Sequence, residues 1–303
     1  MPVIVSRRSA SMKTARCGGI TQQLCRNALR LASKEIPQSE LRRSAIVFSP
    51  HPDDESLGCG GIIIKKKSLG ASVKIVHMTD GSAANHNNLI SRQELKDIRM
   101  LESGRAAAVL GIHSPDIHQL EFPDSRLSEF TAEAVKRITE ILHAEHPEEI
   151  FLPSSREPSR NGADHPATTK IVLEALRLVQ RSTMVREYPI WFWLHWPWIR
   201  LRQGARAVIG TRSVAKNSIE AAFGVRVFSE LRHSVYIGDV LERKRAALSE
   251  HKSQMERIIS DPQWITLGDI SDGQFLNCFN QDYEYFRCYA FNAEARSRPK
   301  SHA

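Results

Sequence analysis

From residue 45 onward, short apolar runs alternate with longer segments in which apolar residues recur every three or four positions. The apolar runs predict strands at 45–48, 73–78, 117–120 and 149–153. The periodic segments predict helices at about 60–68, 91–110, 128–144 and 167–180. Strands that alternate with helices indicate an α/β fold with a mostly parallel sheet and helices on both faces.

The segment before residue 44 has a different pattern. Ile20, Leu24, Ala28 and Leu31 recur at helical spacing, so residues 20–36 are predicted to form an amphipathic helix. We expect this helix to pack on the body, with membrane contact as the alternative. Residues 1–18 contain no acidic residue and resemble either a loose tail or an organellar transit peptide. The predicted organisation is therefore a basic extension, 1–43, one domain, 44–290, and a frayed tail, 291–303.

The C-terminal third begins with a stretch, 188–199, that holds four of the five tryptophans. Its start is predicted to be a buried strand, and the cations that follow are predicted to form a basic insertion around the mouth of a site: Arg200, Arg202, Arg206, Arg212 and Lys216. The alternatives are an interfacial patch or an aromatic platform for sugar rings. A last long helix is predicted from Leu241 to Ile259, and residues 264–289 are predicted to complete the body.

Composition narrows the class of protein. The 303 residues are 41% apolar and 25% charged, as in ordinary globular proteins, and no apolar run reaches the roughly 18 residues of a membrane span. The net charge is +8, but residues 1–43 hold nine Lys and Arg against two Glu, so the body is nearly neutral. This weakens a nucleic-acid-binding role, which would depend on the extension and be lost if residues 1–40 were deleted. Five cysteines without a CxxC pair favour a reducing compartment, and we expect a cytoplasmic protein.

The densest chemistry follows the first predicted strand. Residues 49–55 read Ser-Pro-His-Pro-Asp-Asp-Glu and lie at the carboxyl end of that strand, where open α/β sheets place their ligands. His51 and Asp54 offer an imidazole nitrogen and a carboxylate oxygen for a divalent ion, and Asp53 is left free to take a proton from an activated water. A solvated acidic turn is the alternative, which the preceding strand and the following glycines disfavour.

A second polar loop follows the fourth predicted strand, at the same edge of the sheet. His165 in this loop is the candidate third metal ligand, and Asp164 is placed to accept the second N–H of a ligating imidazole and so orient the site. Three protein ligands and one open position are typical of catalytic Zn²⁺. Fe²⁺ or another divalent ion fits the same donors, so the metal stays open.

Several stretches resemble, in order, the motifs of the PIG-L/LmbE family of zinc-dependent N-deacetylases. The first is Pro-His-Pro-Asp-Asp-Glu at 50–55, followed by a glycine-rich helix start. The others are Thr-Asp-Gly at 79–81, Arg99 with Glu102, Phe-Pro-Asp at 122–124, Asp-His at 164–165 and the Lys-x-x-Ala-Leu-x-x-His-x-Ser-Gln helix at 244–254. The resemblance covers about residues 44–290.

The resemblance implies a Rossmann-like fold, a metal held by His51, Asp54 and His165, and Asp53 as general base. It also implies that Arg99, Asp80 and Asp124 bind substrate. The implied reaction is removal of the N-acetyl group from an N-acetylglucosamine unit by metal-activated water. The substrate would be a small molecule, a glycolipid or a nucleotide sugar, and peripheral membrane contact is a further expectation.

The chain departs from the family at one position. Members often carry a histidine three residues before the ligand His165, where this chain has Gly162. Arg156, Arg160 or His251 is expected to supply the missing positive charge for the oxyanion or the leaving amine. The departure leaves open a catalytically weak or inactive protein of the same fold that binds a sugar or a glycolipid. A hydrolase for another amide is a further alternative, and a dinucleotide site has little support because no Gly-x-Gly-x-x-Gly follows the first strand.

Overall fold

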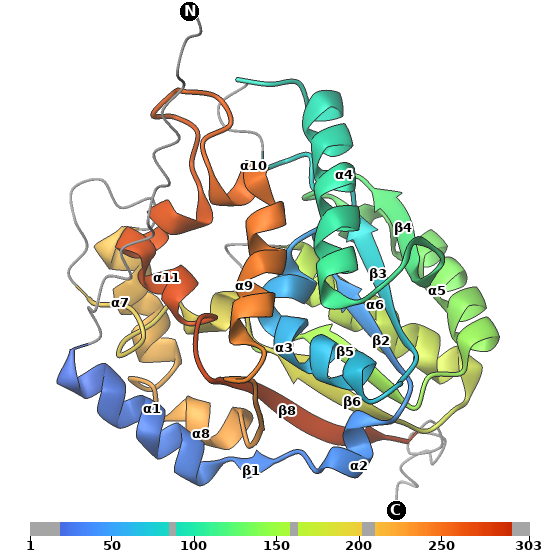
Figure 1. Cartoon of the computed structure of the whole chain (residues 1–303), viewed down its shortest axis with the longest axis horizontal. Helices are drawn as coiled ribbons and strands as arrows, with labels where there is room; N and C mark the ends of the chain where they lie inside the picture. Colours follow the sequence, from blue (N-terminus) through green and yellow to red (C-terminus); the bar gives the residue numbers. More distant parts are fainter. Residues whose placement is uncertain (1–18, 85–88, 158–162, 202–209, 293–303) are drawn as a thin grey trace, which may run out of the picture.

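The computed structural model describes residues 19–84, 89–157, 163–201 and 210–292. Within them, one eight-stranded sheet has the order β1-β7-β8-β6-β5-β2-β3-β4 (Figure 1). The strands are β1 (Lys34–Glu35), β2 (Ala45–Ser49), β3 (Val73–Thr79), β4 (Ile117–Phe122), β5 (Glu149–Pro153), β6 (Thr183–Tyr188), β7 (His233–Tyr236) and β8 (Tyr283–Phe291). Strands β2 to β6 pair in parallel, whereas β8 runs antiparallel to both β6 and β7.

The α-helices are α1 (Ile20–Ala32), α2 (Gln38–Leu41), α3 (Asp54–Ser68), α4 (Arg92–Leu110), α5 (Thr131–Glu145), α6 (Asp164–Val179), α7 (Thr211–Glu220), α8 (Arg226–Glu230), α9 (Leu241–Glu250), α10 (Lys252–Met255) and α11 (Gln274–Asn277). Short 3₁₀ turns occur at Ser114–Asp116, Leu127–Phe130, Trp191–Trp193 and Leu267–Gly273. Helices α3, α4 and α9 pack together on one face of the sheet, and α5 and α6 pack on the other (Figure 1). The predicted α/β class and the helices on both faces are confirmed.

The central strands are buried on both faces. All five residues of β2 are buried, with Val47 in the core beneath α3 and Phe48 in the core beneath α5 and α6. A strand with no solvent face reads as a continuous apolar run, which is why 45–48 carries a strand signal without alternation. Strand β2 lies between β3 and β5, so its carboxyl end opens in the middle of the sheet.

Helix α3 begins six residues earlier than predicted, at Asp54 rather than near residue 60. Gly58, which the prediction left before the helix, lies inside it with Gly60 and Gly61, and neighbouring side chains leave no room there for a Cβ. A Cβ at Gly58 would lie 2.3 Å from the Tyr188 ring, and one at Gly61 would lie 2.5 Å from Ile237. The glycines therefore let the helix approach the sheet and bring its N-terminus directly under the His51 loop.

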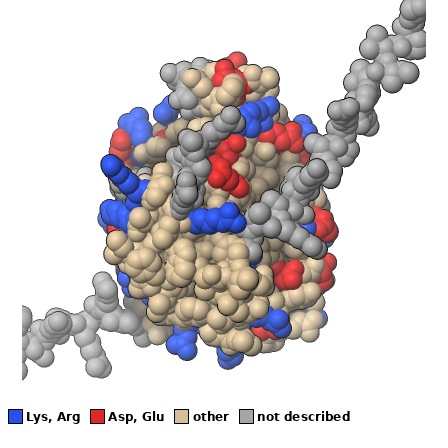
Figure 2. All heavy atoms as spheres, turned by 90° about the vertical axis from the view of Figure 1, so that its left-hand side faces the viewer, with Lys and Arg blue, Asp and Glu red and all other residues tan. Residues whose placement is uncertain are grey.

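The described part of the basic extension is tied to the body. Strand β1 pairs with β7, and the Arg186 guanidinium joins Glu40 to Glu149 beneath the sheet. Helix α1 ends at Ala32, four residues earlier than predicted, and it packs on the body as expected. The face that packs differs: Leu29 and Gln22 are buried, whereas the apolar residues that suggested the helix point outward. Figure 2 shows the side of the molecule on which α1 lies.

Two predictions in the C-terminal third are wrong. The strand before the tryptophan-rich stretch ends at Tyr188, and residues 190–199 form turns in which Trp193 and Trp198 are buried. The predicted long helix breaks at His251, whose ψ of 59° separates α9 from α10. Of the predicted basic insertion, Arg202 and Arg206 lie outside the described residues. Among the described helices, none is long and apolar enough to cross a bilayer.

Candidate metal and active site

The loops that follow β2, β3, β4 and β5 meet at one edge of the sheet, because parallel strands present their carboxyl ends together. They surround a cavity of about 250 Å³. Its polar wall includes His51, Asp53 and Asp54 from the first loop and Asp164 from the start of α6. Trp191 and Phe275, whose rings stack at 5.0 Å, form an apolar wall beside them.

Three donor groups face one another in this cavity. The Nδ1 of His51 lies 3.2 Å from Oδ2 of Asp54, and the Nε2 of His165 lies 3.3 Å from the same oxygen. All three donor atoms fall within 4.8 Å of one another. Ligands that sit 2.0–2.1 Å from a tetrahedral ion are roughly 3.3 Å apart, so the two nitrogens and the carboxylate fit a zinc-sized divalent ion.

The outer nitrogen of each imidazole has a carboxylate partner. The Nε2 of His51 lies 3.3 Å from both Asp124 Oδ1 and Asp164 Oδ2, and the Nδ1 of His165 lies 2.7 Å from Glu157 Oε2. Such partners fix the ring orientation and the tautomer of ligating histidines. Asp164, expected to orient the site, therefore lies beside His51, and the residue that holds His165 is Glu157.

The charges around these donors are strongly coupled. Burial alone would raise the pKa of Asp54, but the charges and hydrogen bonds of His165 and His51 together outweigh burial and hold that pKa well below its usual range. Burial likewise opposes protonation of His165, yet Asp54 and Glu157 raise its pKa to about 9. Because Asp54 and Glu157 both favour the protonated ring, a metal at His165 must compete with a proton.

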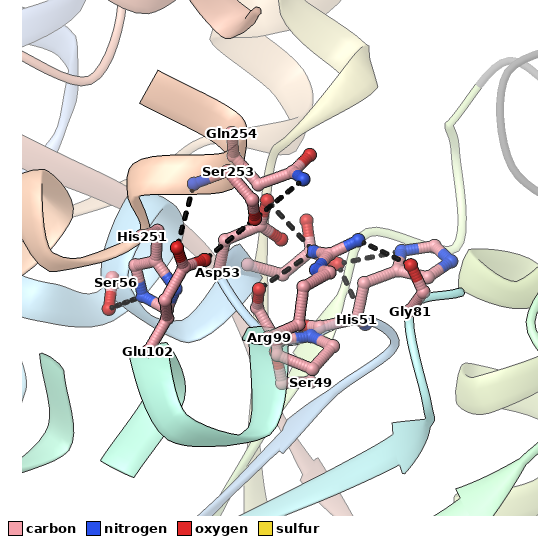
Figure 3. A network of polar contacts seen from close by, with 12 residues as sticks. Ser49, His51, Asp53, Ser56, Gly81, Arg99, Glu102, His251, Ser253 and Gln254 are labelled. Carbon is pink, nitrogen blue, oxygen red and sulfur yellow. Dashed lines mark hydrogen bonds and ion pairs between the residues drawn. The ribbon is translucent and has the colours of Figure 1, made fainter. Parts of the chain in front are cut away.

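Asp53 faces the same cavity, but its carboxylate pairs with Arg99 and not with the candidate metal ligands. Its Oδ2 lies 3.2 Å from Nη2 of Arg99, and burial raises its pKa to about 6, against the opposing effect of Arg99. Its backbone φ of 154° lies in a region that side-chain-bearing residues rarely adopt. The strained backbone directs the carboxylate towards Arg99 at the wall of the cavity (Figure 3).

Arg99, expected to touch the substrate, is buried and holds the loops together. It donates to the carbonyl oxygens of Gly81 at 2.9 Å and Pro52 at 2.7 Å (Figure 3). Asp80, also expected to bind substrate, accepts from the backbone N–H groups of Ser82 and Asp124. Arg99, from α4, and Asp124, from the loop after β4, line the cavity, whereas Asp80 lies in the loop after β3 and is not among the lining residues.

The candidate acid residues lie elsewhere. His251 is buried behind the site, 3.1 Å from Ser56 Oγ and 3.5 Å from Glu55, and is not among the residues that line the cavity. Arg156 is half exposed and pairs with Glu230 at 3.7 Å. Arg160 and Gly162 lie outside the described residues.

Two further groups reach the site without having been predicted. The indole N–H of Trp191 donates to His165 Nε2 at 3.2 Å, and Gln254 lines the cavity from α10. Glu157 lies in the polar loop after β5, so its position in the sequence places it near the site. Nothing in the sequence distinguishes it from the other polar residues of that loop. Glu102 holds α10 in place, since its carboxylate accepts from Ser253 N at 2.8 Å and from Ser253 Oγ at 2.6 Å (Figure 3).

The model of the GlcNAc-PI de-N-acetylase (PIG-L) family matches residues 46–176. A diacetylchitobiose deacetylase of Thermococcus kodakarensis is 28% identical over 212 residues, which are 70% of each chain. The solved N,N′-diacetylchitobiose deacetylase of Pyrococcus horikoshii has a TM-score of 0.58 at 21% identity and covers 90% of this chain and 92% of its own. The zinc-inhibited form of the teicoplanin deacetylase Orf2 has a TM-score of 0.54 at 14% identity and covers 83% of this chain and 99% of its own. The two solved structures share this fold.

Proposed function

Because the chain belongs to the PIG-L/LmbE family of deacetylases, we propose that it hydrolyses the N-acetyl group of an N-acetylglucosamine-containing glycoconjugate. The observation that carries the proposal is the His51, Asp54 and His165 donor set with a fourth group, Asp53, beside it. A structural metal site has no use for a strained, buried carboxylate next to its ligands. The similar diacetylchitobiose deacetylases support the substrate class. We propose that residues 44–290 act as one domain in this reaction.

His51, Asp54 and His165 would hold the ion, with zinc the first candidate. When bound, it would lower the pKa of a water molecule and polarise the acetamide carbonyl. Glu157 keeps the second nitrogen of His165 occupied, and Asp124 and Asp164 do the same for His51. These contacts leave one nitrogen of each ring directed at Asp54.

Asp53 acts as the general base and takes the proton of the attacking water. The same carboxylic acid then returns the proton to the departing amine, so the reaction needs no histidine at position 162. The Arg99 guanidinium keeps Asp53 oriented while it is ionised. Trp191 and Phe275 offer the apolar wall against which a pyranose ring packs.

The test is the release of free acetate from a panel of N-acetylglucosamine substrates: the free sugar, a chitobioside, a nucleotide sugar and a lipid-linked sugar. Metal content is assayed in the same preparation. Wild type is expected to release acetate from at least one of them. Asp53→Asn should retain stoichiometric metal and lose at least about a hundredfold in turnover, as loss of a general base does.

The matched control is Asp97→Asn, a neutralised aspartate on the outer part of α4 that does not line the cavity. It should keep both metal and turnover. A bound metal with no acetate from any substrate would contradict deacetylation and favour the alternative of a sugar-binding protein. Equal turnover in Asp53→Asn and wild type would remove Asp53 from the mechanism.

A further inference from the structure

Helix α1 shows its apolar side to solvent. Each residue advances about 100° around a helix, so positions 20, 24, 28 and 31 fall within about 80° of one another. Ile20, Leu24 and Leu31 are 83%, 62% and 86% exposed. Leu29 and Gln22, on the opposite side, are buried, and Gln22 donates to the Trp198 carbonyl oxygen at 2.9 Å. A surface helix normally turns its apolar stripe inward, and this one does the reverse.

The turn between α7 and α8 adds apolar surface. Helix α8 packs beside α1, and three successive residues with positive φ, from Ala222 to Gly224, make the turn that precedes α8 (Figure 1). Phe223 and Val225 in this turn are 53% and 65% exposed. Figure 2 shows a broad area without charged side chains on this side of the molecule, bordered by Lys and Arg and, at the right of the view, also by Asp and Glu. Patches of this kind mark interaction surfaces.

The charge beside this surface is positive. Residues 1–34 contain seven Lys and Arg and no Asp or Glu. Of the seven, Arg30 lies on the flank of α1 about 80° from Ile20 and stacks over the Tyr283 ring at 5.3 Å, whereas Arg26 lies towards the buried side of the helix. An isologous dimer through α1 would bring these like charges together. An anionic partner avoids that repulsion.

We propose that the apolar stripe of α1 docks on the surface of an anionic lipid bilayer, with Arg30 on its flank directed at the headgroup phosphates. A helix with one apolar face, a basic flank and no acidic residue is the form that lies in a membrane interface. The attraction of such cations to an anionic surface weakens as salt rises. The inference is independent of the deacetylase proposal, because vesicle binding is measured without turnover.

The experiment is co-sedimentation of the full chain with vesicles of pure phosphatidylcholine and with vesicles that also contain phosphatidylglycerol. Binding is expected only to the second kind and should weaken as salt rises. The double variant Leu24→Ser with Leu31→Ser should bind at least about tenfold more weakly, because two exposed leucines no longer enter the interface. Arg30→Gln should weaken binding and flatten its salt dependence.

The control is Leu101→Ser with Leu178→Ser, two leucines equally exposed on α4 and α6, which should leave binding unchanged. Equal binding by the α1 variant and this control would overturn the proposal, as would the absence of binding to anionic vesicles. Sedimentation velocity supplies a further arm. A concentration-dependent dimer that the α1 leucine variant abolishes, without vesicle binding, would assign the surface to a second copy of the chain instead.

Discussion

At the scale of single residues, the site depends on which carboxylate stands next to which nitrogen. Asp53 and Asp54 are adjacent in the chain, yet burial raises the pKa of Asp53 to about 6 while His165 and His51 together hold that of Asp54 well below its usual range. The difference follows from their partners, a guanidinium at 3.2 Å for Asp53 and two imidazoles for Asp54. Two neighbouring carboxylates can thus serve as base and ligand.

Glu157→Gln tests the partner of His165. The amide cannot accept the Nδ1 proton with the charge of a carboxylate, so His165 becomes a weaker and less oriented ligand. Metal affinity should fall about 10- to 100-fold, measured by competition with a chromophoric chelator. Glu129→Gln, an exposed glutamate of the same charge, should leave affinity unchanged. Unchanged affinity in Glu157→Gln would remove it from the site.

Gly81→Ala tests the loop that Arg99 holds. Gly81 has φ +66°, and an added Cβ would lie 2.8 Å from the Arg99 guanidinium. We expect a loss of about 1–3 kcal/mol in the free energy of unfolding and reduced turnover, because Arg99 must leave Asp53.

Gly104→Ala is the matched control for this substitution. Gly104 lies inside α4 with open space around its Cβ, so alanine there should stabilise by about 0.5–1 kcal/mol. Urea denaturation of both variants measures whether each substitution lowers or raises the free energy of unfolding. Equal effects would show that the contact with Arg99 carries no strain.

The sequence was enough to place His51, Asp54 and His165 together, because each follows a recognisable strand and parallel strands end at one edge of the sheet. It was not enough to identify the carboxylates that hold the outer nitrogens of the two histidines. Glu157 lies in the turn after β5 and Asp164 begins α6, and nothing in their spacing along the chain says that the first holds His165 and the second His51. Trp191 was read as part of a strand, whereas its indole donates to a candidate ligand.

At the scale of elements, periodicity located helices better than it identified their buried faces. The strands and α4 followed their patterns, with Ser91 and Gly111 capping α4 as their residue types suggest. Helix α3 begins earlier than its glycines suggested. These glycines lie within the helix, where close neighbouring side chains rather than a turn require them. Helix α1 was predicted from an apolar stripe that does not face the core. The burial of Leu29 depends on distant residues, which no local pattern contains.

The two faces of α1 can be separated by substituting leucines two positions apart. Leu29→Ala should cost about 2–5 kcal/mol in the free energy of unfolding, because it leaves a cavity in the main core. Leu31→Ala removes the same atoms from an exposed position and should change stability by less than about 0.5 kcal/mol. Denaturant unfolding of the two variants measures the difference, and similar losses would mean that both faces of α1 are packed.

At the scale of the whole molecule, His195 links folding to pH. Burial lowers its pKa to about 4, and its Nδ1 lies 2.6 Å from the Phe192 carbonyl oxygen. Below pH 6.5 the unfolded chain binds a proton at His195 that the folded chain does not bind. Stability is therefore complete above pH 6.5 and declines by up to about 3 kcal/mol as pH falls towards 4. His195→Asn keeps an N–H donor without the charge and should flatten this decline, measured by urea denaturation across that range. His113→Asn, at an exposed site, should leave the slope as in wild type.

Strand β8 lies between β6 and β7, and β1 reaches the rest of the sheet only through β7 and β8. During synthesis, the strands from β2 to β6 can pair as soon as they leave the ribosome, whereas β1 waits for β7, about two hundred positions later. The first described helix is thus among the last elements to be fixed. Until β7 and β8 have been made, the nascent chain carries the basic segment of α1, with its apolar stripe, in front of a partly formed sheet to which β1 is not yet paired. A chain interrupted before β8 would keep the proposed metal ligands and lose the surface that α1 forms.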